Sequence, residues 1–355
     1  MRGKKIRAVY RRKIIGWMLA GTLALAGCAS GSGAEEEIVI IEREGGGGGH
    51  LQEEASAEGG SDVPAGRENA VAVGEEEESP NENIEGEPEV IEKDWSEYFG
   101  GLNGAAVVYD AARGQYMIYN KELAMTQRSP CSTFKIISSL IALENGIIEP
   151  GDSPRPWSGE TYWNENWNRD IDFYDAFRSS CVWYFREVID EIGQEMMAEE
   201  LEELLYGNRD ISDWEGRLNT NNNNRALTGF WIESSLKISP LEQAETMERI
   251  FGEGSVYSEK TKNELKKVML VEEENRTDTV IYGKTGMGKA QGIVVDAWFT
   301  GFAENMEGKV FFCVYLGRTD GGDVSSAAAR EIAIRIVPET FFESRSRYGI
   351  TESGL

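Results

Sequence analysis

A serine and a lysine stand three residues apart at the start of a strongly apolar segment, in SPCSTFKIISSLIALENGI (129–147). Residues three apart lie on one face of a helix, so Ser132 and Lys135 can contact each other. Burial favours a neutral lysine because desolvation destabilises the charged form. The pair could therefore be a nucleophile and its base, with backbone amides at the helix start facing an oxyanion. The alternative is that Ser132 only caps the helix.

Histidine is almost absent, which narrows the chemistry. The single histidine, His50, lies at the end of a glycine run. The rest of the chain therefore cannot use Ser-His-Asp or Cys-His catalysis or a histidine-ligated metal. The spacing of Cys131, Cys181 and Cys313 fits no zinc pattern. We expect no metal site, and a serine nucleophile must take its base from another residue type.

Two further motifs follow in order along the chain. Ser180 and Val182 form a Ser-x-Val motif on a segment that we expect to be helical. Lys284, Thr285 and Gly286 form Lys-Thr-Gly on a predicted strand. Each motif alone is weak, but the ordered set of Ser-x-x-Lys, Ser-x-Val and Lys-Thr-Gly resembles the penicillin-recognising serine enzymes.

Two other segments narrow the resemblance to the class D, or oxacillinase-type, β-lactamases. YGNRDIS (206–212) contains the Tyr-Gly-Asn of that family. GFWIESSLKISPLEQ (229–243) is similar to its Phe-Trp-Leu-Glu-Gly-x-Leu-x-Ile-Ser segment. The resemblance covers essentially all of residues 95–340, whereas DWEGRLNTNNNNRAL (213–227) looks like an insertion.

The resemblance implies a role for each matching residue. Ser132 would attack the β-lactam carbonyl and form the acyl-enzyme. Lys135 would carry CO2, supplied by bicarbonate, as an N6-carboxylysine and serve as general base for acylation and deacylation. Trp231 would donate its indole N–H to that carbamate. Ser180 and Lys284 would relay protons and help to hold the substrate.

The resemblance also implies a set of substrate contacts. Val182 would keep the pocket apolar, which favours a neutral lysine that can take up CO2. The backbone amides of Ser132 and Met287 would form the oxyanion hole. Arg330 would pair with the substrate's carboxylate, for which lysine and threonine are also suitable partners. The substrate-binding residues are then Val182, Thr285, Gly286, Met287 and Arg330.

A glutamate in the insertion is a second candidate for the residue that activates the deacylating water. WEGRLN (214–219) resembles the Glu-x-x-Leu-Asn element of class A β-lactamases, in which the glutamate positions the deacylating water. If Glu215 did so, Lys135 would need no CO2. Class A enzymes, however, usually have Ser-Asp-Asn where this chain has Ser-Cys-Val (180–182). We therefore interpret Glu215 as a loop residue.

Two cysteines lie beside the motif residues. Cys131 directly precedes Ser132, and Cys181 lies inside the Ser-x-Val motif. In an exported protein they could form a disulfide, because extracytoplasmic compartments are oxidising. The alternative is two buried free thiols.

The elements that must position these residues favour an α+β fold. GAAVVYDAARGQYMIYN (104–120) predicts a β-hairpin. In ISPLEQ, Ser239, Pro240 and Glu242 predict a capped helix start. We expect an antiparallel sheet flanked by helices and built from both ends of the chain, with a mainly helical subregion between. The other predicted strands are 277–286, 293–304 and 308–318; the other predicted helices start at 132 or span 175–192, 194–205, 258–270 and 325–337.

The N-terminal residues predict export. A basic start, an apolar stretch and the sequence LAGC predict a lipoprotein signal peptide over residues 1–28, with Cys28 lipidated and holding the protein on the membrane. The alternative is a lone membrane helix. Residues 29–94 are rich in glycine and glutamate and predict a disordered acidic tether. The catalytic domain would then span residues 95–355.

The overall prediction is an exported β-lactam hydrolase at the extracytoplasmic face of the cell membrane of a Gram-positive host. The net charge of −26 argues against nucleic acid as a partner, since phosphates bind basic surfaces. The alternatives are a penicillin-binding peptidase or a β-lactam sensor, which are acylated but not turned over, and a binding lipoprotein. Val182 favours hydrolysis, because peptidases usually have asparagine there.

Overall fold

The computed structural model describes residues 88–271, 278–322 and 324–347. Cys28, the predicted signal peptide and residues 29–87 of the predicted tether lie outside the described residues. The strands are β1 (Glu89–Glu92), β2 (Gly104–Asp110), β3 (Gln115–Tyr119), β4 (Val280–Ala290), β5 (Ile293–Asn305) and β6 (Gly308–Gly317). The α-helices are α1 (Ser96–Phe99), α2 (Lys121–Ala124), α3 (Lys135–Glu144), α4 (Phe173–Arg178), α5 (Val182–Ile192), α6 (Gln194–Glu203), α7 (Pro240–Phe251), α8 (Glu259–Met269) and α9 (Ser326–Arg347). Three 3-10 helices are η1 (Cys131–Phe134), η2 (Glu165–Trp167) and η3 (Arg225–Leu227).

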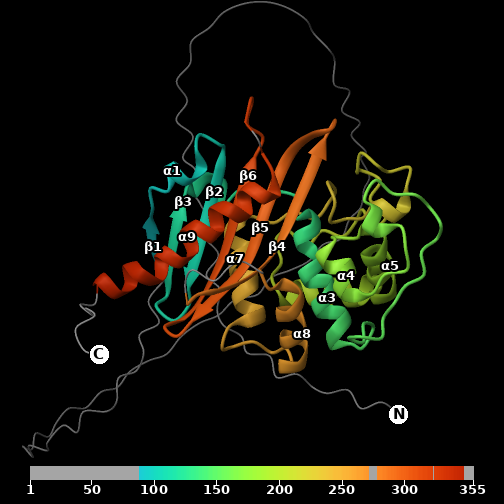
Figure 1. The fold of residues 1–355 in the computed structure, drawn as a ribbon, viewed down its shortest axis with the longest axis horizontal. Coiled ribbons are helices and arrows are strands. Elements are labelled where there is room, and N and C mark those ends of the chain that lie inside the picture. Colours follow the sequence, from blue (N-terminus) through green and yellow to red (C-terminus); the bar gives the residue numbers. More distant parts are fainter. Residues whose placement is uncertain (1–87, 272–277, 323, 348–355) are drawn as a thin grey trace, which may run out of the picture. The chain divides into compact units, whose positions relative to one another are not determined.

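The sheet draws strands from both ends of the described chain, as the sequence predicts. Its order is β1-β3-β2-β6-β5-β4, so the N-terminal hairpin β2–β3 meets the C-terminal meander β4–β6 where β2 pairs with β6 (Figure 1). All neighbouring strands are antiparallel except β1 and β3, which are parallel. With helices beside the sheet and a helical region inserted between its two halves, the fold is α+β.

Strand β1 lies within the segment that we expect to be a tether. Its four residues pair with β3 from Glu89 to Glu92, yet its side chains are mostly exposed. Backbone hydrogen bonds to the edge of the sheet therefore hold it, more than burial of its side chains. The described fold thus begins before Trp95, the first residue of the predicted domain.

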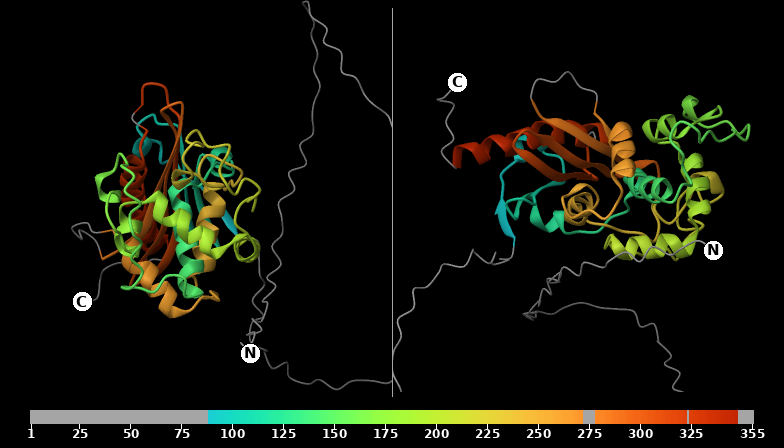
Figure 2. Two further views of the ribbon diagram at one scale, coloured as in Figure 1. Left: turned by 90° about the vertical axis from the view of Figure 1, so that its right-hand side faces the viewer. Right: turned by 90° about the horizontal axis from the view of Figure 1, so that it is seen from below.

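Helices cover both faces of the sheet (Figure 2). The α9 helix packs one face through Ala329, Ile332 and Ala333, against Phe299 and Phe312 of β5 and β6. The α7 helix packs the other face and also contacts the helical region, because Met247 and Phe251 lie in the same core cluster as Phe134. Neighbouring residues of a strand point to opposite faces of the sheet, so side chains of β5 pack against the helices on both faces.

The start of α7 has the predicted capping box. Ser239 Oγ accepts from the backbone N–H of Glu242 at 3.2 Å, and Glu242 Oε2 accepts from the backbone N–H of Ser239 at 2.8 Å. Pro240 occupies the first turn, where a helix has no use for its missing N–H. The prediction from Ser239, Pro240 and Glu242 is confirmed.

The Ser239→Ala substitution should lower the free energy of unfolding by about 1 kcal/mol, because the cap acceptor is lost. Urea unfolding of the full chain measures it. Glu242→Gln is the matched control, since glutamine also completes a capping box. An unfolding midpoint that is equal in all three proteins would contradict this account of the helix start.

Candidate active site

Ser132 lies in a strained turn at the edge of the helical region. It occupies η1, which runs directly into α3 at Lys135, so it is not the N-cap of the α-helix that we expect. The first residue of η1 is Cys131, whose φ of 49° lies in the left-handed region and therefore interrupts a regular α-helical start. Such strained residues cluster at functional sites. Ser132 itself is only half-buried, so its hydroxyl is accessible.

Lys135 lies beside the hydroxyl of Ser132, with 3.2 Å between its Nζ and Ser132 Oγ. The structure thus brings together the two residues that the spacing predicts to meet. Lys135 is 1% exposed, and its Nζ lies 5.3 Å from the centre of the Phe185 ring. Burial lowers the pKa of Lys135 to about 8. The amine can therefore become neutral near physiological pH and take a proton from Ser132.

A second buried lysine reaches the site from the sheet. Lys284 Nζ, on β4, donates to Ser180 Oγ at 2.9 Å and to the backbone oxygen of Thr285 at 2.9 Å. Burial, together with the charge of Lys135, lowers its pKa well below the usual range. Ser180 has a φ of 58° and lies in the turn before α5, not inside a helix as we expect; the strained backbone points its hydroxyl at Lys284. Val182 is the half-buried first residue of α5.

Gly286 lets β4 approach the nucleophile turn. A Cβ at this position would lie 2.9 Å from the backbone oxygen of Pro130, 2.9 Å from Thr133 Cγ2 and 3.2 Å from the Thr133 amide. Two of these distances are shorter than a Cβ normally allows, so a side chain at position 286 would force β4 or η1 to shift. Since β4 is the last strand of the sheet, its outer edge is open to η1. The absence of a side chain at Gly286 therefore lets the backbones of β4 and η1 approach each other closely.

Trp231 is fully buried beside this turn. Its backbone oxygen accepts from the Cys131 amide at 2.9 Å and from Ser129 Oγ at 3.1 Å. Its ring stacks on Phe134, with 6.1 Å between ring centroids. The indole Nε1 is buried without a hydrogen-bond partner. Because an unpaired buried donor costs about 1–3 kcal/mol, this N–H is suited to a group that the site takes up.

The remaining substrate-binding candidates lie on strand β4 and on helix α9. Thr285 pairs in register with Phe299 of β5, and its Oγ1 accepts from Lys284 Nζ at 3.4 Å, so its hydroxyl lies beside the second lysine. Arg330 is a half-buried residue of α9. Met287 is 40% exposed on β4. Lys284 Nζ therefore contacts both Thr285 and Ser180.

Ser129 is a supporting residue that the sequence alone does not single out. It is buried, and its Oγ donates to the Trp231 oxygen while accepting from the Glu233 amide at 2.8 Å. It therefore joins the nucleophile segment to the segment that carries Trp231. A serine before a proline is too common for its position to have indicated this role.

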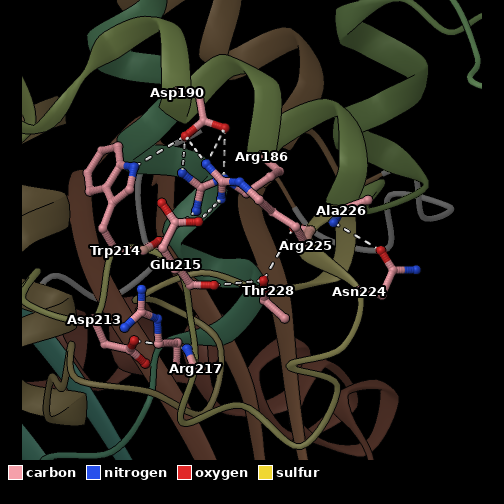
Figure 3. Close-up of polar contacts among 10 residues, drawn as sticks. All are labelled: Arg186, Asp190, Asp213, Trp214, Glu215, Arg217, Asn224, Arg225, Ala226 and Thr228. Carbon is pink, nitrogen blue, oxygen red and sulfur yellow. Dashed lines mark hydrogen bonds and ion pairs between the residues drawn. The ribbon is translucent and has the colours of Figure 1, made fainter.

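Glu215 lies in a turn, and its carboxylate forms an ion pair with another side chain. Its Oε2 pairs with Arg225 Nη1 at 2.7 Å, and its backbone oxygen accepts from Thr228 Oγ1 at 2.9 Å (Figure 3). Its side chain is 43% exposed. These contacts agree with a loop residue whose carboxylate stabilises the insertion.

The cysteines beside the motifs are free thiols. Cys131, Cys181 and Cys313 are all buried and unbridged. Burial raises the pKa of Cys131 to about 12 and that of Cys181 to about 11. Thiols with such pKa values are poor nucleophiles. Of the two alternatives left open by the sequence, the structure therefore has free thiols, which fill space beside Ser132 and Ser180.

The described residues contain neither a cluster that could bind a metal nor a helix that could span a membrane. In residues 88–271, 278–322 and 324–347, no three or more His, Cys, Asp or Glu side chains are grouped so that they could hold a metal ion. No helix within these ranges has both the length and the apolar character needed to cross a membrane.

Comparison with known proteins shows the family. Residues 104–337 match the model of the penicillin binding protein transpeptidase domain. The chain is 32% identical over 260 residues to the regulatory protein BlaR1 of Bacillus licheniformis, covering 73% of this chain but only 39% of that protein. It is 30% identical to the probable beta-lactamase YbxI of Bacillus subtilis (strain 168), covering 67% of this chain and 81% of YbxI.

A solved structure agrees with these sequence relatives. The C-terminal domain of the Bacillus licheniformis BlaR penicillin-receptor superposes with a TM-score of 0.62 at 30% identity, covering 71% of this chain and 96% of that domain. The chain therefore belongs to the penicillin-binding transpeptidase-fold family of serine enzymes. The resemblance inferred from the ordered motifs is confirmed at this level.

The Gly286→Ala substitution should slow covalent labelling of Ser132 by a fluorescent penicillin roughly ten- to hundredfold, because the added Cβ displaces β4 from η1. Gly254→Ala is the matched control, since a Cβ there meets nothing within 4 Å. Labelling rates and thermal unfolding are measured on both proteins. Equal rates would mean that the close approach of β4 does not matter.

Proposed function

We propose that this protein hydrolyses β-lactams through an acyl-enzyme on Ser132, as a class D serine β-lactamase. The observation that carries the proposal is the buried Lys135, whose Nζ lies 3.2 Å from Ser132 Oγ and whose pKa burial lowers to about 8. Family membership supports the acylation chemistry, and the class D motifs of the sequence support the hydrolytic step.

Acylation begins when Ser132 loses its proton to the Lys135 side chain and attacks the β-lactam carbonyl. The backbone amides of Ser132 and Met287 stabilise the oxyanion. The pair formed by Lys284 and Ser180 passes a proton to the departing ring nitrogen, because its 2.9 Å hydrogen bond provides the path. Thr285 and Arg330 bind the substrate's carboxylate.

The site fits a carboxylated Lys135. The amine is buried and readily neutral, as carbamate formation requires. Trp231 Nε1 is a buried donor without a partner and would bind the new oxygens. When bound, CO2 supplies an anionic oxygen base for both acylation and deacylation. Glu215 is not needed as a base, since Arg225 already engages its carboxylate.

A receptor that is acylated and not turned over is the second candidate. The resemblance to the regulatory protein BlaR1 and to the BlaR penicillin-receptor domain favours it. The resemblance to YbxI, a probable beta-lactamase, favours hydrolysis. We prefer hydrolysis because Lys135 is buried beside the Phe185 ring, which favours the neutral amine that can take up CO2, and because Val182 stands where peptidases usually have asparagine.

We also propose that residues 1–28 direct export and that Cys28 is lipidated, which holds the catalytic domain on the extracytoplasmic face of the membrane. The apolar stretch ending in LAGC supports this. Mass spectrometry of the membrane fraction should find Cys28 as a diacylated N-terminal residue. Recovery of the unprocessed Met1 end would contradict it.

The full chain should turn over a chromogenic cephalosporin continuously, and the rate should rise when bicarbonate is added, because Lys135 then carries its base. Stopped-flow absorbance follows the reaction. Ser132→Ala is the control and should abolish both turnover and labelling. A single stoichiometric burst would instead establish a receptor or penicillin-binding protein. Turnover whose rate does not depend on bicarbonate after degassing would make Glu215 the candidate base in place of a carboxylated Lys135.

In CO2-depleted buffer, acylation of Ser132 should depend on the protonation of Lys135. Its folded-state pKa is lowered to about 8, so the neutral amine is scarce below pH 8 and predominates above it. The acylation rate should therefore rise about tenfold from pH 6 to pH 7 and level off above pH 8. Stopped-flow labelling across this range checks it, with Lys135→Ala as the control. A flat profile would show that Lys135 is not the base.

A further inference from the structure

A buried arginine lies directly under Trp231. Arg186, on α5, is 3% exposed, and its guanidinium carbon lies 5.2 Å from the centroid of the Trp231 ring. It lies 5.3 Å from the centroid of the Trp214 ring as well. The cation therefore contacts both aromatic rings, and such contacts are stronger when they are shielded from water.

The guanidinium is fixed in this place by polar contacts. Arg186 Nη1 donates to the backbone oxygen of Trp214 at 2.9 Å. Its Nη2 and Nε both contact the carboxylate of Asp190, one helical turn further along α5. Asp190 also accepts from Trp214 Nε1 at 3.2 Å and from Arg225 Nη2 at 3.0 Å, as Figure 3 shows. The planar fork of Arg186 thus has little freedom to leave Trp231.

The Trp231 ring itself is held only by packing. Its backbone is anchored to the nucleophile segment, but its indole N–H has no partner. Phe134 stacks on the ring, Phe230 meets it edge-on at 5.3 Å, and the carbon skeleton of the ring passes over Gly229, where a Cβ would lie 1.9 Å from it. Arg186 is the charged group in contact with the ring. Removing it would leave space in which the indole could turn.

We propose that Arg186, held by Asp190, is a positioning residue that sets the affinity of Lys135 for CO2. It fixes the plane of the Trp231 indole, so that the N–H remains available to the carboxylated lysine and pays no cost of ordering on uptake. A cation close to this donor also favours the anionic lysine over the neutral one. The inference rests on the proposed function, because it concerns the same carboxylated Lys135.

The insertion provides a matched control. Arg225 bridges Asp190 and Glu215, so Glu215 belongs to the same ion-pair network but lies at its exposed end. Glu215→Gln breaks the outer pair and leaves the contacts of Arg186 with Asp190, Trp214 and Trp231 intact. It therefore separates an effect of positioning Trp231 from a general effect on the insertion.

The experiment measures CO2 uptake by the full chain directly. The carbamate carbon is observed by NMR during titration with 13C-bicarbonate, and its intensity gives the affinity. The variants are Arg186→Met, Arg186→Lys and Asp190→Asn, with Glu215→Gln as control. Arg186→Met should weaken the affinity at least tenfold, Arg186→Lys less, because a cation remains over the ring, and Asp190→Asn several-fold. Glu215→Gln should match the wild type.

Several outcomes distinguish the two proposals. Wild-type protein without a carbamate signal would overturn the carboxylated lysine itself, and with it this inference. A wild-type signal with unchanged affinity in Arg186→Met and Asp190→Asn would overturn the positioning role alone. Asp190 is partly exposed, so Asp190→Asn provides a folded variant if Arg186→Met unfolds. Weakening in Glu215→Gln equal to that in Arg186→Met would also overturn it, since the effect would then belong to the insertion.

Discussion

The burial of one amine is the constraint on which the site depends. Lys135 is almost completely buried, next to Ser132 and the Phe185 ring, and among the described residues no carboxylate forms an ion pair with it. An ammonium in such a place is costly, so its pKa is lowered. The described part of the fold has no histidine, yet it holds an amine that is readily neutral at ordinary pH. Burial and the charge of Lys135 likewise lower the pKa of the second buried lysine, Lys284, because like charges close together disfavour each other.

The fold places the Lys135 amine next to the edge strand β4. The sheet supplies Lys284 on its last strand, β4, and the helical region supplies Ser180 in a strained turn. Gly286 removes the side chain that would keep β4 from the nucleophile turn. The junction of the two regions therefore holds the polar groups, while α7 and α9 pack the sheet that carries β4 from either face.

Acylation and turnover place different demands on this fold. Acylation needs Ser132, a base and an oxyanion site, which hydrolases and receptors of the family can share. Turnover also needs a base that activates water, and in the proposed function this base is the carboxylated Lys135 next to Trp231. That residue is joined by its backbone to the nucleophile segment and by its ring to Arg186 and the insertion. In the proposed function, these groups behind the nucleophile support the hydrolytic step.

The sequence by itself determined the family, the order of the motifs, the hairpin and the cap at Ser239, because each is written in local spacing or in turn chemistry. It also indicated that Ser132 and Lys135 share a face. Only the tertiary structure decided that Ser132 lies in a 3-10 turn, that Ser180 lies outside a helix, and that β1 joins the sheet. Those features follow from backbone strain and from pairing between distant segments, which the local periodicity of the sequence does not indicate. The place of Arg186 beneath Trp231 is of the same kind, since contacts across 45 residues of chain leave no mark in either segment alone.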